Sequence, residues 1–484
     1  MSQSTSSKRI SRRSLIKAGS AAGVVASGAF PESAEAHDSA QRPGVRATSL
    51  QAIRQRVEVT PIVDTHEHLI EEQDRLSGKH PRIQANDWSF LLSHYLNNDL
   101  TTSGMPTEAS KAFFSPTVDP IDKWKLLAPY WPRVLHTGYA QAVSIAMQRI
   151  YGVGELSERT VRSVQEGYTK TIQPGFYRKL LQQIGNIESC QVNSLERPFM
   201  ESRQPTLLMQ DVNISGMHMG PSIDTYASAA GVKVTELSDW HRVIDWWFAT
   251  YGSYAVAVKS TGAYSRNLDY EDIPAEQVEG IFKRRLNRDP LSPEEHKRLQ
   301  DHLFWYCVRK ATENNLPVKL HTGYYTGANS MPLQRLQGNA AAAADLCRKA
   351  PNTRFVFMHI NYPSYEDLIA VAKHYTNCYV DMCWSWIISP VASVNFLKQY
   401  LVTAPANKVL TFGGDYIPVE PVIGHVALAR QGIALALEQL VQERWLTLNS
   451  AVDLVESLLP GNARALFNLE EKTRRLQKAP WLST

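Results

Sequence analysis

The chain lacks three features that would place it in other classes of protein. None of its apolar runs approaches the roughly 20 residues that a membrane-spanning helix needs. Its five cysteines show no C-x-x-C spacing, which argues against a zinc ribbon or a disulfide framework. We expect most of them to be buried apolar residues, with a single disulfide left open. No internal repeat is visible beyond the alternation described below.

An excess of one charge is also missing from most of the chain. The 484 residues carry a net charge of +4, and the first 36 residues supply +3 of it through five basic and two acidic side chains. The rest of the chain therefore keeps only +1. A strongly basic surface of the kind that binds nucleic acid is not indicated.

The first 36 residues have the pattern of an export signal. The twin arginine Arg12-Arg13 precedes a mildly apolar stretch over 18–30, and Ala34-Glu35-Ala36 resembles a cleavage site. We predict a twin-arginine signal peptide over 1–36 and a periplasmic or secreted protein without stable membrane insertion after cleavage. A basic disordered tail is the alternative. Residues 37–57 are predicted to form a flexible lead-in.

Short apolar segments alternate with helix-like stretches along the remaining chain. Strands are predicted near 59–63, 187–191, 206–211, 254–258, 316–320, 354–358, 379–381 and 408–414, and helices near 238–249, 293–314, 339–349 and 365–375. This alternation predicts a parallel sheet. The length fits one α/β (β/α)8 TIM barrel over 58–475 better than several domains. The stretch from about 86 to 180 reads as a helical insertion that covers the barrel mouth.

His66 and His68 follow the first predicted strand. Residues two apart on a strand project to one face, so these imidazoles point at one place, and neutral imidazole is a common zinc ligand. Such a pair alone is more often an ordinary surface doublet. However, four more residues able to bind a metal follow later strands: Lys259, His321, His359 and Asp415. The C-terminal ends of barrel strands converge on one pocket, so the sequence predicts a metal centre there.

The order of these residues resembles the amidohydrolase superfamily of metal-dependent (β/α)8 barrels. That family carries His-x-His on strand 1, Lys on strand 4, His on strands 5 and 6, and Asp on strand 8. Motifs similar to the amidohydrolase-related branch are Val258-Lys259-Ser260, Leu320-His321-Thr322-Gly323, Met358-His359-Ile360-Asn361-Tyr362-Pro363, Tyr379-Val380-Asp381 and Phe412-Gly413-Gly414-Asp415. The long segment after strand 1 and Trp384-Ser385-Trp386 resemble uronate isomerases. The resemblance covers about 59–469 and implies a divalent metal, with zinc favoured, as one or two ions.

The ligand types predict a reaction. Zinc lowers the pKa of a bound water from about 15.7 to near 7, so we predict a hydrolase that uses metal-activated water on a C–N or C–O bond of a small polar substrate. Asp415 would bind metal and carry the proton to the leaving group. Lys259 has no acceptor as an ammonium, but a carbamylated Lys259 would bridge two metals. Otherwise Lys259 stays cationic and binds the substrate or an acidic neighbour.

Five further residues are candidates for substrate binding, although each type is as often a packing or surface residue. Arg266 suits an anion clamp. Tyr264 or Tyr324 would polarise a carbonyl, and Trp384 with Trp386 would form a flat wall if they share a face. Two other functions stay open: a uronate-isomerase-like isomerase or lyase acting on a sugar acid, and a non-catalytic binding barrel. A homo-oligomer is compatible with the sequence.

Overall fold

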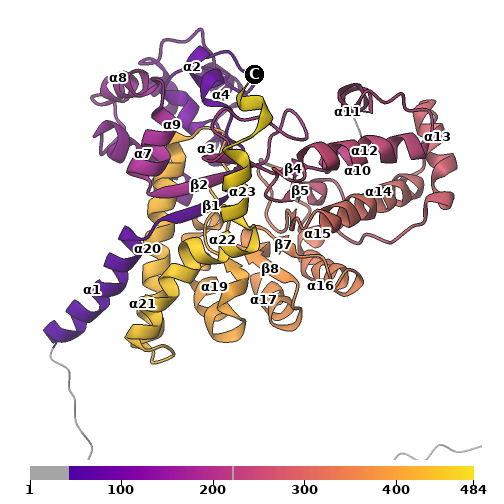
Figure 1. Cartoon of the computed structure of the whole chain (residues 1–484). Helices are drawn as coiled ribbons and strands as arrows, with labels where there is room; N and C mark the ends of the chain where they lie inside the picture. The colour runs from indigo at the N-terminus through magenta and orange to yellow at the C-terminus, as the bar shows by residue number, and fades with distance from the viewer. Residues whose placement is uncertain (1–42, 221–222, 484) are drawn as a thin grey trace, which may run out of the picture. The chain divides into compact units, whose positions relative to one another are not determined.

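The computed structural model of the protein describes residues 43–220 and 223–483 (Figure 1). The predicted twin-arginine signal lies outside the described residues. From Ala47 onwards the chain forms one compact unit. No helix in the described ranges is long and apolar enough to cross a membrane. All five cysteines are buried and free, as expected for apolar packing residues.

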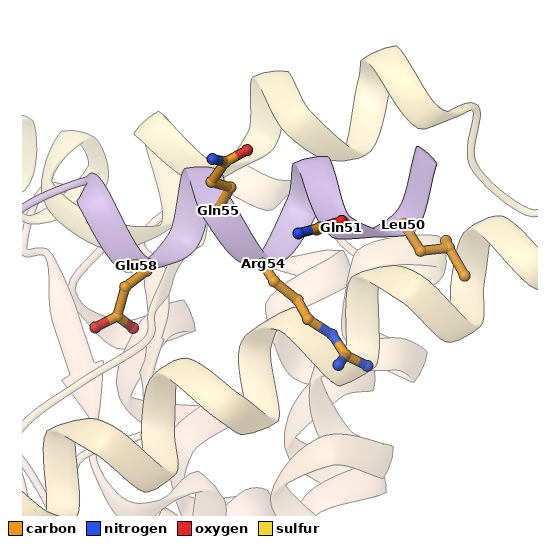
Figure 2. A pocket seen from close by; sticks show the side chains of 5 residues that line it. All are labelled: Leu50, Gln51, Arg54, Gln55 and Glu58. Atoms are coloured by element: carbon orange, nitrogen blue, oxygen red, sulfur yellow. The ribbon is translucent and has the colours of Figure 1, made fainter. Parts of the chain in front are cut away.

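The prediction of a flexible lead-in over 37–57 is corrected for the part that the structure describes, because Pro43–Val59 forms the helix α1. Ile53 and Val57 are four residues apart, lie on one face and are buried in the core. Arg54 donates to Glu438 of helix α20 (Glu420–Gln442) at 2.5 and 2.8 Å. A surface hollow on the outer side of α1 is lined by Leu50, Gln51, Arg54, Gln55 and Glu58 (Figure 2). It gathers no set of metal-binding side chains.

The strands form two parallel sheets, in the orders β1-β2-β3 and β4-β5-β6-β7-β8-β9. They span Ile62–Glu67, Ile187–Val192, Leu208–Gln210, Val212–Asn213, Val258–Ser260, Val318–Leu320, Phe355–Phe357, Cys378–Asp381 and Val409–Leu410. Asp211 joins β3 to β4, and its N–H donates to the carbonyl of Val192 at 2.9 Å. β3 and β4 therefore occupy one strand position, which leaves eight positions in the order of the chain.

The first and last strand positions are joined by backbone hydrogen bonds. The N–H of Thr65 donates to Phe412 at 3.0 Å. The N–H of Asp415 donates to His66 at 2.8 Å. Eight parallel positions linked end to end are the arrangement of a TIM barrel, and the predicted fold class is confirmed. The carboxyl ends of β1 and β9 thus lie side by side, which positions the residues that follow them.

Helices separate the strands as predicted. Those after the insertion are α10 Ser215–His218, α11 Ile223–Ala230, α12 Leu237–Tyr251, α13 Glu279–Leu286, α14 Pro293–Glu313, α15 Leu333–Gln337, α16 Asn339–Lys349, α17 Tyr365–His374, α18 Ser385–Ile388, α19 Pro390–Thr403, α20, α21 Leu448–Glu456, α22 Asn462–Leu466 and α23 Leu469–Leu476. The helix α14 begins where the sequence indicates, because Ser292 and Glu295 form a reciprocal capping box around Pro293.

The predicted insertion is helical. It contains η1 Trp88–Leu92, α3 Leu96–Thr102, α4 Thr107–Phe113, α5 Lys123–Leu127, α6 Trp131–Val134, α7 Gly138–Tyr151, α8 Val161–Thr171 and α9 Phe176–Arg178, after the short α2 Glu72–Ser77. Figure 1 shows α7 beside the upper part of α20. Gly424 of α20 permits this approach, since an added Cβ would overlap the carbonyl of Ala142 in α7. The insertion is therefore packed onto the barrel.

Candidate metal centre

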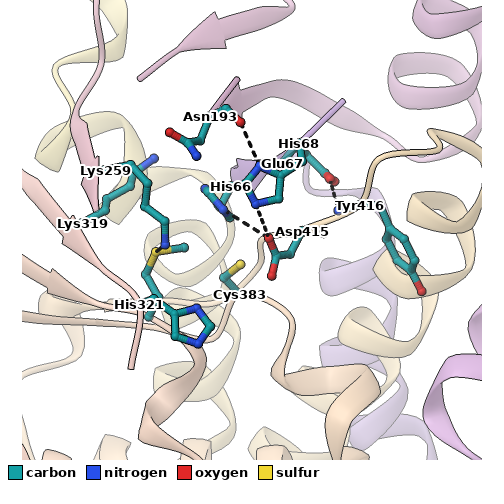
Figure 3. Close-up of polar contacts among 12 residues, drawn as sticks. His66, Glu67, His68, Asn193, Lys259, Lys319, His321, Cys383, Asp415 and Tyr416 are labelled. Atoms are coloured by element: carbon teal, nitrogen blue, oxygen red, sulfur yellow. Dashed lines mark hydrogen bonds and ion pairs between the residues drawn. The ribbon is translucent and has the colours of Figure 1, made fainter. Parts of the chain in front are cut away.

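Three predicted ligands meet at the carboxyl end of β1. His66 and His68 place their rings 4.8 Å apart at a steep angle. Their Nε2 atoms lie 3.2 and 3.3 Å from the same oxygen, Oδ1 of Asp415 (Figure 3). One carboxylate oxygen facing two imidazole nitrogens is a donor set that a divalent metal can bind.

The turn after β9 brings Asp415 to this place. Its backbone is left-handed, with φ of +64°, and its N–H bonds back to His66. The preceding Gly414 is required there, because an added Cβ would overlap the carboxylate of Glu67. The N–H of Gly414 also donates to Asp64 at 3.2 Å. The Gly413-Gly414 pair that precedes the aspartate in the sequence therefore has a steric reason.

Backbone carbonyls orient two of the histidines. Nδ1 of His68 lies 2.8 Å from the carbonyl of Asn193, and Nδ1 of His359 lies 3.0 Å from that of Cys383. A proton on Nδ1 that is donated to a carbonyl leaves Nε2 as an acceptor, as in metal-binding histidines. Nε2 of His359 is buried and has no hydrogen-bond partner among the described residues, and Nδ1 of His66 also lacks one. Buried polar atoms without partners are costly, and Nε2 of His359 is therefore a ring nitrogen left available to a ligand.

The electrostatics of these residues suit a cation. Burial lowers the pKa of His66 and His68, and it lowers that of His359 to about 4, so all three imidazoles are neutral at pH 7. For Asp415, burial opposes ionisation, but the hydrogen bond to His66 and the nearby histidines hold its pKa well below the usual range. Neutral nitrogen donors around an ionised carboxylate are the donor chemistry that zinc prefers.

His321 lies beside this group rather than inside it. It follows β6, and its ring centroid is 4.4 Å from that of His359. Its Nε2 is 2.9 Å from the carbonyl of Tyr324. Two tight sets of potential ligands occur among the described residues, and His321 is in neither: His66, His68 and Asp415; His359, Cys383 and Asp415.

Lys259 is the central residue of β5, and its side chain is buried. Its Nζ contacts the sulfur of Met358 at 2.7 Å. Figure 3 shows Lys259 among the residues of the site. Burial lowers the pKa of Lys259 to about 8. Its charge also contributes to the lowered pKa of His66, so the two groups lie near one another. A buried, partly neutral amine is the form that reacts with carbon dioxide.

The structure does not leave Arg266 free to act as an anion clamp. Its guanidinium pairs with the buried Asp301 of α14 at 2.5 Å and lies 4.2 Å from the ring centroid of Tyr270. Its partner Asp301 lies 35 positions later in the chain, so the local sequence around Arg266 does not reveal the pairing.

The prediction that Trp384 and Trp386 form a flat wall is corrected, because the two tryptophans do not share a strand face. Ser385–Ile388 forms α18, and Nε1 of Trp386 donates to the carbonyl of Thr411 at 2.8 Å. Its ring packs where an added Cβ on Gly432 would overlap it. Trp386 is therefore a packing residue between α18 and α20.

The remaining aromatic candidates do lie at the site. Trp384 is fully buried, and its ring meets that of His359 edge to face at 5.4 Å. The ring centroid of Tyr324 lies 5.7 Å from that of Trp384, and the ring centroid of Tyr264 lies 4.4 Å from that of His321. These rings line the same end of the barrel as the predicted ligands.

Tyr95 of the insertion was not predicted. Its ring stacks on Trp384 at 4.6 Å, and its hydroxyl donates to the carbonyl of Asp415. Its neighbour His94 accepts from the N–H of Ile417 at 3.1 Å. No sequence signal marks them, since they lie in an irregular helical stretch remote from every strand end. The insertion nevertheless contributes directly to the wall of the site.

The second half of the chain is similar to a known family. Residues 239–469 match the family described as amidohydrolase. This region is amidohydrolase-like. A second similarity is to Protein fluG of Emericella nidulans, which is 28% identical over 233 residues and is matched by 45% of this chain. The match spans about a quarter of that protein's length, 26%.

Solved structures extend the likeness to most of the chain. A glucuronate isomerase of Caulobacter crescentus has a TM-score of 0.71 and 16% identity, covering 88% of this chain and 95% of its own. A uronate isomerase of Thermotoga maritima has a TM-score of 0.69, 14% identity and coverage of 87% and 97%. A Lactobacillus casei protein assigned as a metal-dependent hydrolase has a TM-score of 0.60, 14% identity and coverage of 87% and 98%. The predicted family resemblance is confirmed, and the solved structures show that the likeness is one of overall fold.

Proposed function

We propose that the protein is a metal-dependent hydrolase that cleaves a C–N or C–O bond, as in an amide or lactone, of a small polar substrate. The observation that carries this proposal is the convergence of Nε2 of His66 and Nε2 of His68 on one oxygen of Asp415. His66 and Asp415 are buried, and the side chain of His68 is 12% exposed. A neutral pair of imidazoles beside a carboxylate is competent to hold a metal such as zinc.

The residues around this set have separable tasks. A divalent metal held there would supply Lewis-acid activation of water. Asp415 is ionised, so it can receive the proton of the attacking water and deliver it to the leaving group. Tyr95 stacks on Trp384, and Trp384 meets the ring of His359 edge to face, so these two aromatic rings help to exclude bulk water from the site. Tyr264 lies on His321 and is placed to contact the substrate.

Zinc, as one or two ions, is the metal we propose, with carbamylation of Lys259 as the route to a bridging anion. Its buried amine and lowered pKa support this modification. The carbamate would give two oxygens where the ammonium has only donors.

A sugar-acid isomerase or lyase is the second candidate. Its support is the fold likeness to two uronate isomerases, which covers 87% and 88% of this chain. A sugar acid needs a cation for its carboxylate. Arg266 is neutralised by Asp301, and Arg82 donates to Glu196 at 2.7 Å. Because neither guanidinium is unpaired, a sugar-acid carboxylate would have to bind the metal itself.

The direct test is to assay zinc-loaded protein against lactones, N-acyl amino acids and uronates. Turnover of either of the first two classes, lost on chelation and restored by zinc, is the expected result. Isomerisation of a uronate would replace the first candidate by the second. Absence of turnover with every class, together with tight ligand binding, would indicate a non-catalytic barrel. The matched control is Asp415→Asn, which keeps the shape of the side chain but not its charge.

We also propose export by the twin-arginine route. Replacing Arg12 and Arg13 with lysine is expected to retain the protein in the cytoplasm with unchanged activity, as measured by cell fractionation. Undiminished export of the variant would remove this proposal.

A further inference from the structure

A second set of potential ligands lies beside the first and includes a cysteine. His359, Cys383 and Asp415 each offer one ligand atom, and these atoms lie within 4.8 Å of one another. All three residues are buried, with 1%, 0% and 5% of their surfaces exposed. Asp415 belongs to both sets, so the two could hold neighbouring ions.

His359 gives independent evidence that this second set faces a ligand. Its Nδ1 is fixed by the carbonyl of Cys383, while its buried Nε2 has no hydrogen-bond partner among the described residues. The backbone of Cys383 thus orients the histidine, and its thiol belongs to the same donor set. A satisfied core histidine would have both nitrogens paired.

The chain around Cys383 is built to hold the thiol in place. The N–H of Cys383 donates to the carboxylate of Asp381, 2.8 Å away, at the end of β8. The following Trp384 is left-handed, and its N–H donates to Gly413 at 2.8 Å. A Cβ added to Gly413 would come within 2.9 Å of the sulfur of Cys383. Figure 3 shows the sulfur on the side of Cys383 that faces Asp415 and His66.

We propose that Cys383 is a metal ligand, which together with His359 and Asp415 forms a second metal subsite. This inference rests on the metal centre of the proposed function. On binding, the thiol loses its proton to solvent and the sulfur bonds to the metal as a thiolate. The thiolate then supplies anionic charge to the second ion, so a carbamate on Lys259 is not needed for that purpose. A thiolate ligand also favours zinc, cobalt or cadmium over magnesium and manganese.

Cobalt titration of the metal-free full chain tests the proposal. We expect two equivalents to bind, with a sulfur-to-cobalt charge-transfer band in the near ultraviolet that grows with one of them. In Cys383→Ala this band should be absent, and the affinity for that ion should fall by more than about tenfold. The matched control is Cys307→Ala in α14, which also removes a fully buried thiol and should keep the band.

A measurement on the unaltered protein guards against a variant that fails to fold. The cadmium-113 NMR spectrum of the cadmium-loaded chain should contain one resonance shifted downfield by a single thiolate. Cobalt and cadmium spectra typical of nitrogen and oxygen ligands alone would overturn the role of Cys383 and leave the proposed function standing. Absence of any metal binding would overturn both.

Discussion

Two buried polar clusters in the same barrel differ in whether their central nitrogen groups have hydrogen-bond partners. In the first, Nζ of Lys319 donates to both carboxylate oxygens of Asp211 at 2.9 and 3.1 Å, to Gln191 at 2.6 Å and to the carbonyl of Thr65 at 2.8 Å. In the second, the metal centre, Nε2 of His359 and Nδ1 of His66 lack partners within the described part of the chain.

The paired cluster has a structural role, whereas the unpaired nitrogens of the metal centre are those expected of a functional site. The Lys319 cluster joins β1, β2, β6 and the junction of β3 and β4, and its ammonium is fully used by protein oxygens. It has no donor left for a substrate. The metal centre keeps unsatisfied nitrogens in a shielded place, which is costly unless something binds there. Four predictions test this comparison, in order of decreasing effect.

The largest effect is expected at the metal centre. Replacing Asp415 with Ala removes the carboxylate shared by His66 and His68 and should lower turnover by more than about a hundredfold, the lower range for loss of a general acid–base group alone. Metal content, measured by elemental analysis, should fall with it. Far-ultraviolet circular dichroism should stay unchanged. An Asp415→Ala enzyme with full metal content and activity would contradict the assignment of the site.

The Lys319 cluster should show the opposite response, which is a loss of stability without a loss of metal affinity. Lys319→Met leaves the carboxylate of Asp211 buried and unpaired, so the free energy of unfolding should fall by about 3–5 kcal/mol, as measured with denaturant. Metal affinity of the folded fraction should not change.

The double variant Lys319→Met with Asp211→Asn is the control, because it removes the stranded charge and should recover part of the lost stability. A single variant as stable as the parent chain would show that the cluster does not hold the barrel together.

The effect of replacing Lys259 depends on whether its amine is carbamylated. If it is carbamylated and bridges two ions, Lys259→Ala should lose about one metal per chain and most activity, and added acetate should restore part of both. If it is a free ammonium, the variant should keep its metal and show no rescue. Metal content with and without acetate distinguishes the two, and a bare amine beside a single ion would favour the isomerase.

The smallest effect is expected in the insertion. Tyr95→Phe removes one hydrogen bond to the carbonyl of Asp415 and should cost about 1 kcal/mol of stability, measured by thermal unfolding. Tyr139→Phe is the matched control, because Tyr139 also stacks in this group but its hydroxyl has no hydrogen-bond partner among the described residues. Equal effects of both changes would mean that the Asp415 contact contributes nothing specific.

The local sequence pattern was sufficient to predict a site residue where a short strand ends on a residue that can bind a metal. The predicted strand and helix positions agree with the structure to within a few residues, and His66, His68, His359 and Asp415 meet as expected. Pattern failed where a partner is remote in sequence. Asp211 carried no signal of its own, because Lys319, which neutralises it, lies 108 positions later.

The sequence by itself determined the barrel, the helical insertion and the position of each predicted ligand on a strand end, because strand periodicity and the parallel topology direct these side chains to one edge. Only the tertiary structure decided which of them are open to a ligand. In the folded chain Arg266 pairs with Asp301, and Trp386 packs between α18 and α20. Cys383 and Tyr95 lie next to Asp415. Pairing in a buried site depends on distances between remote segments, and linear order does not contain those distances.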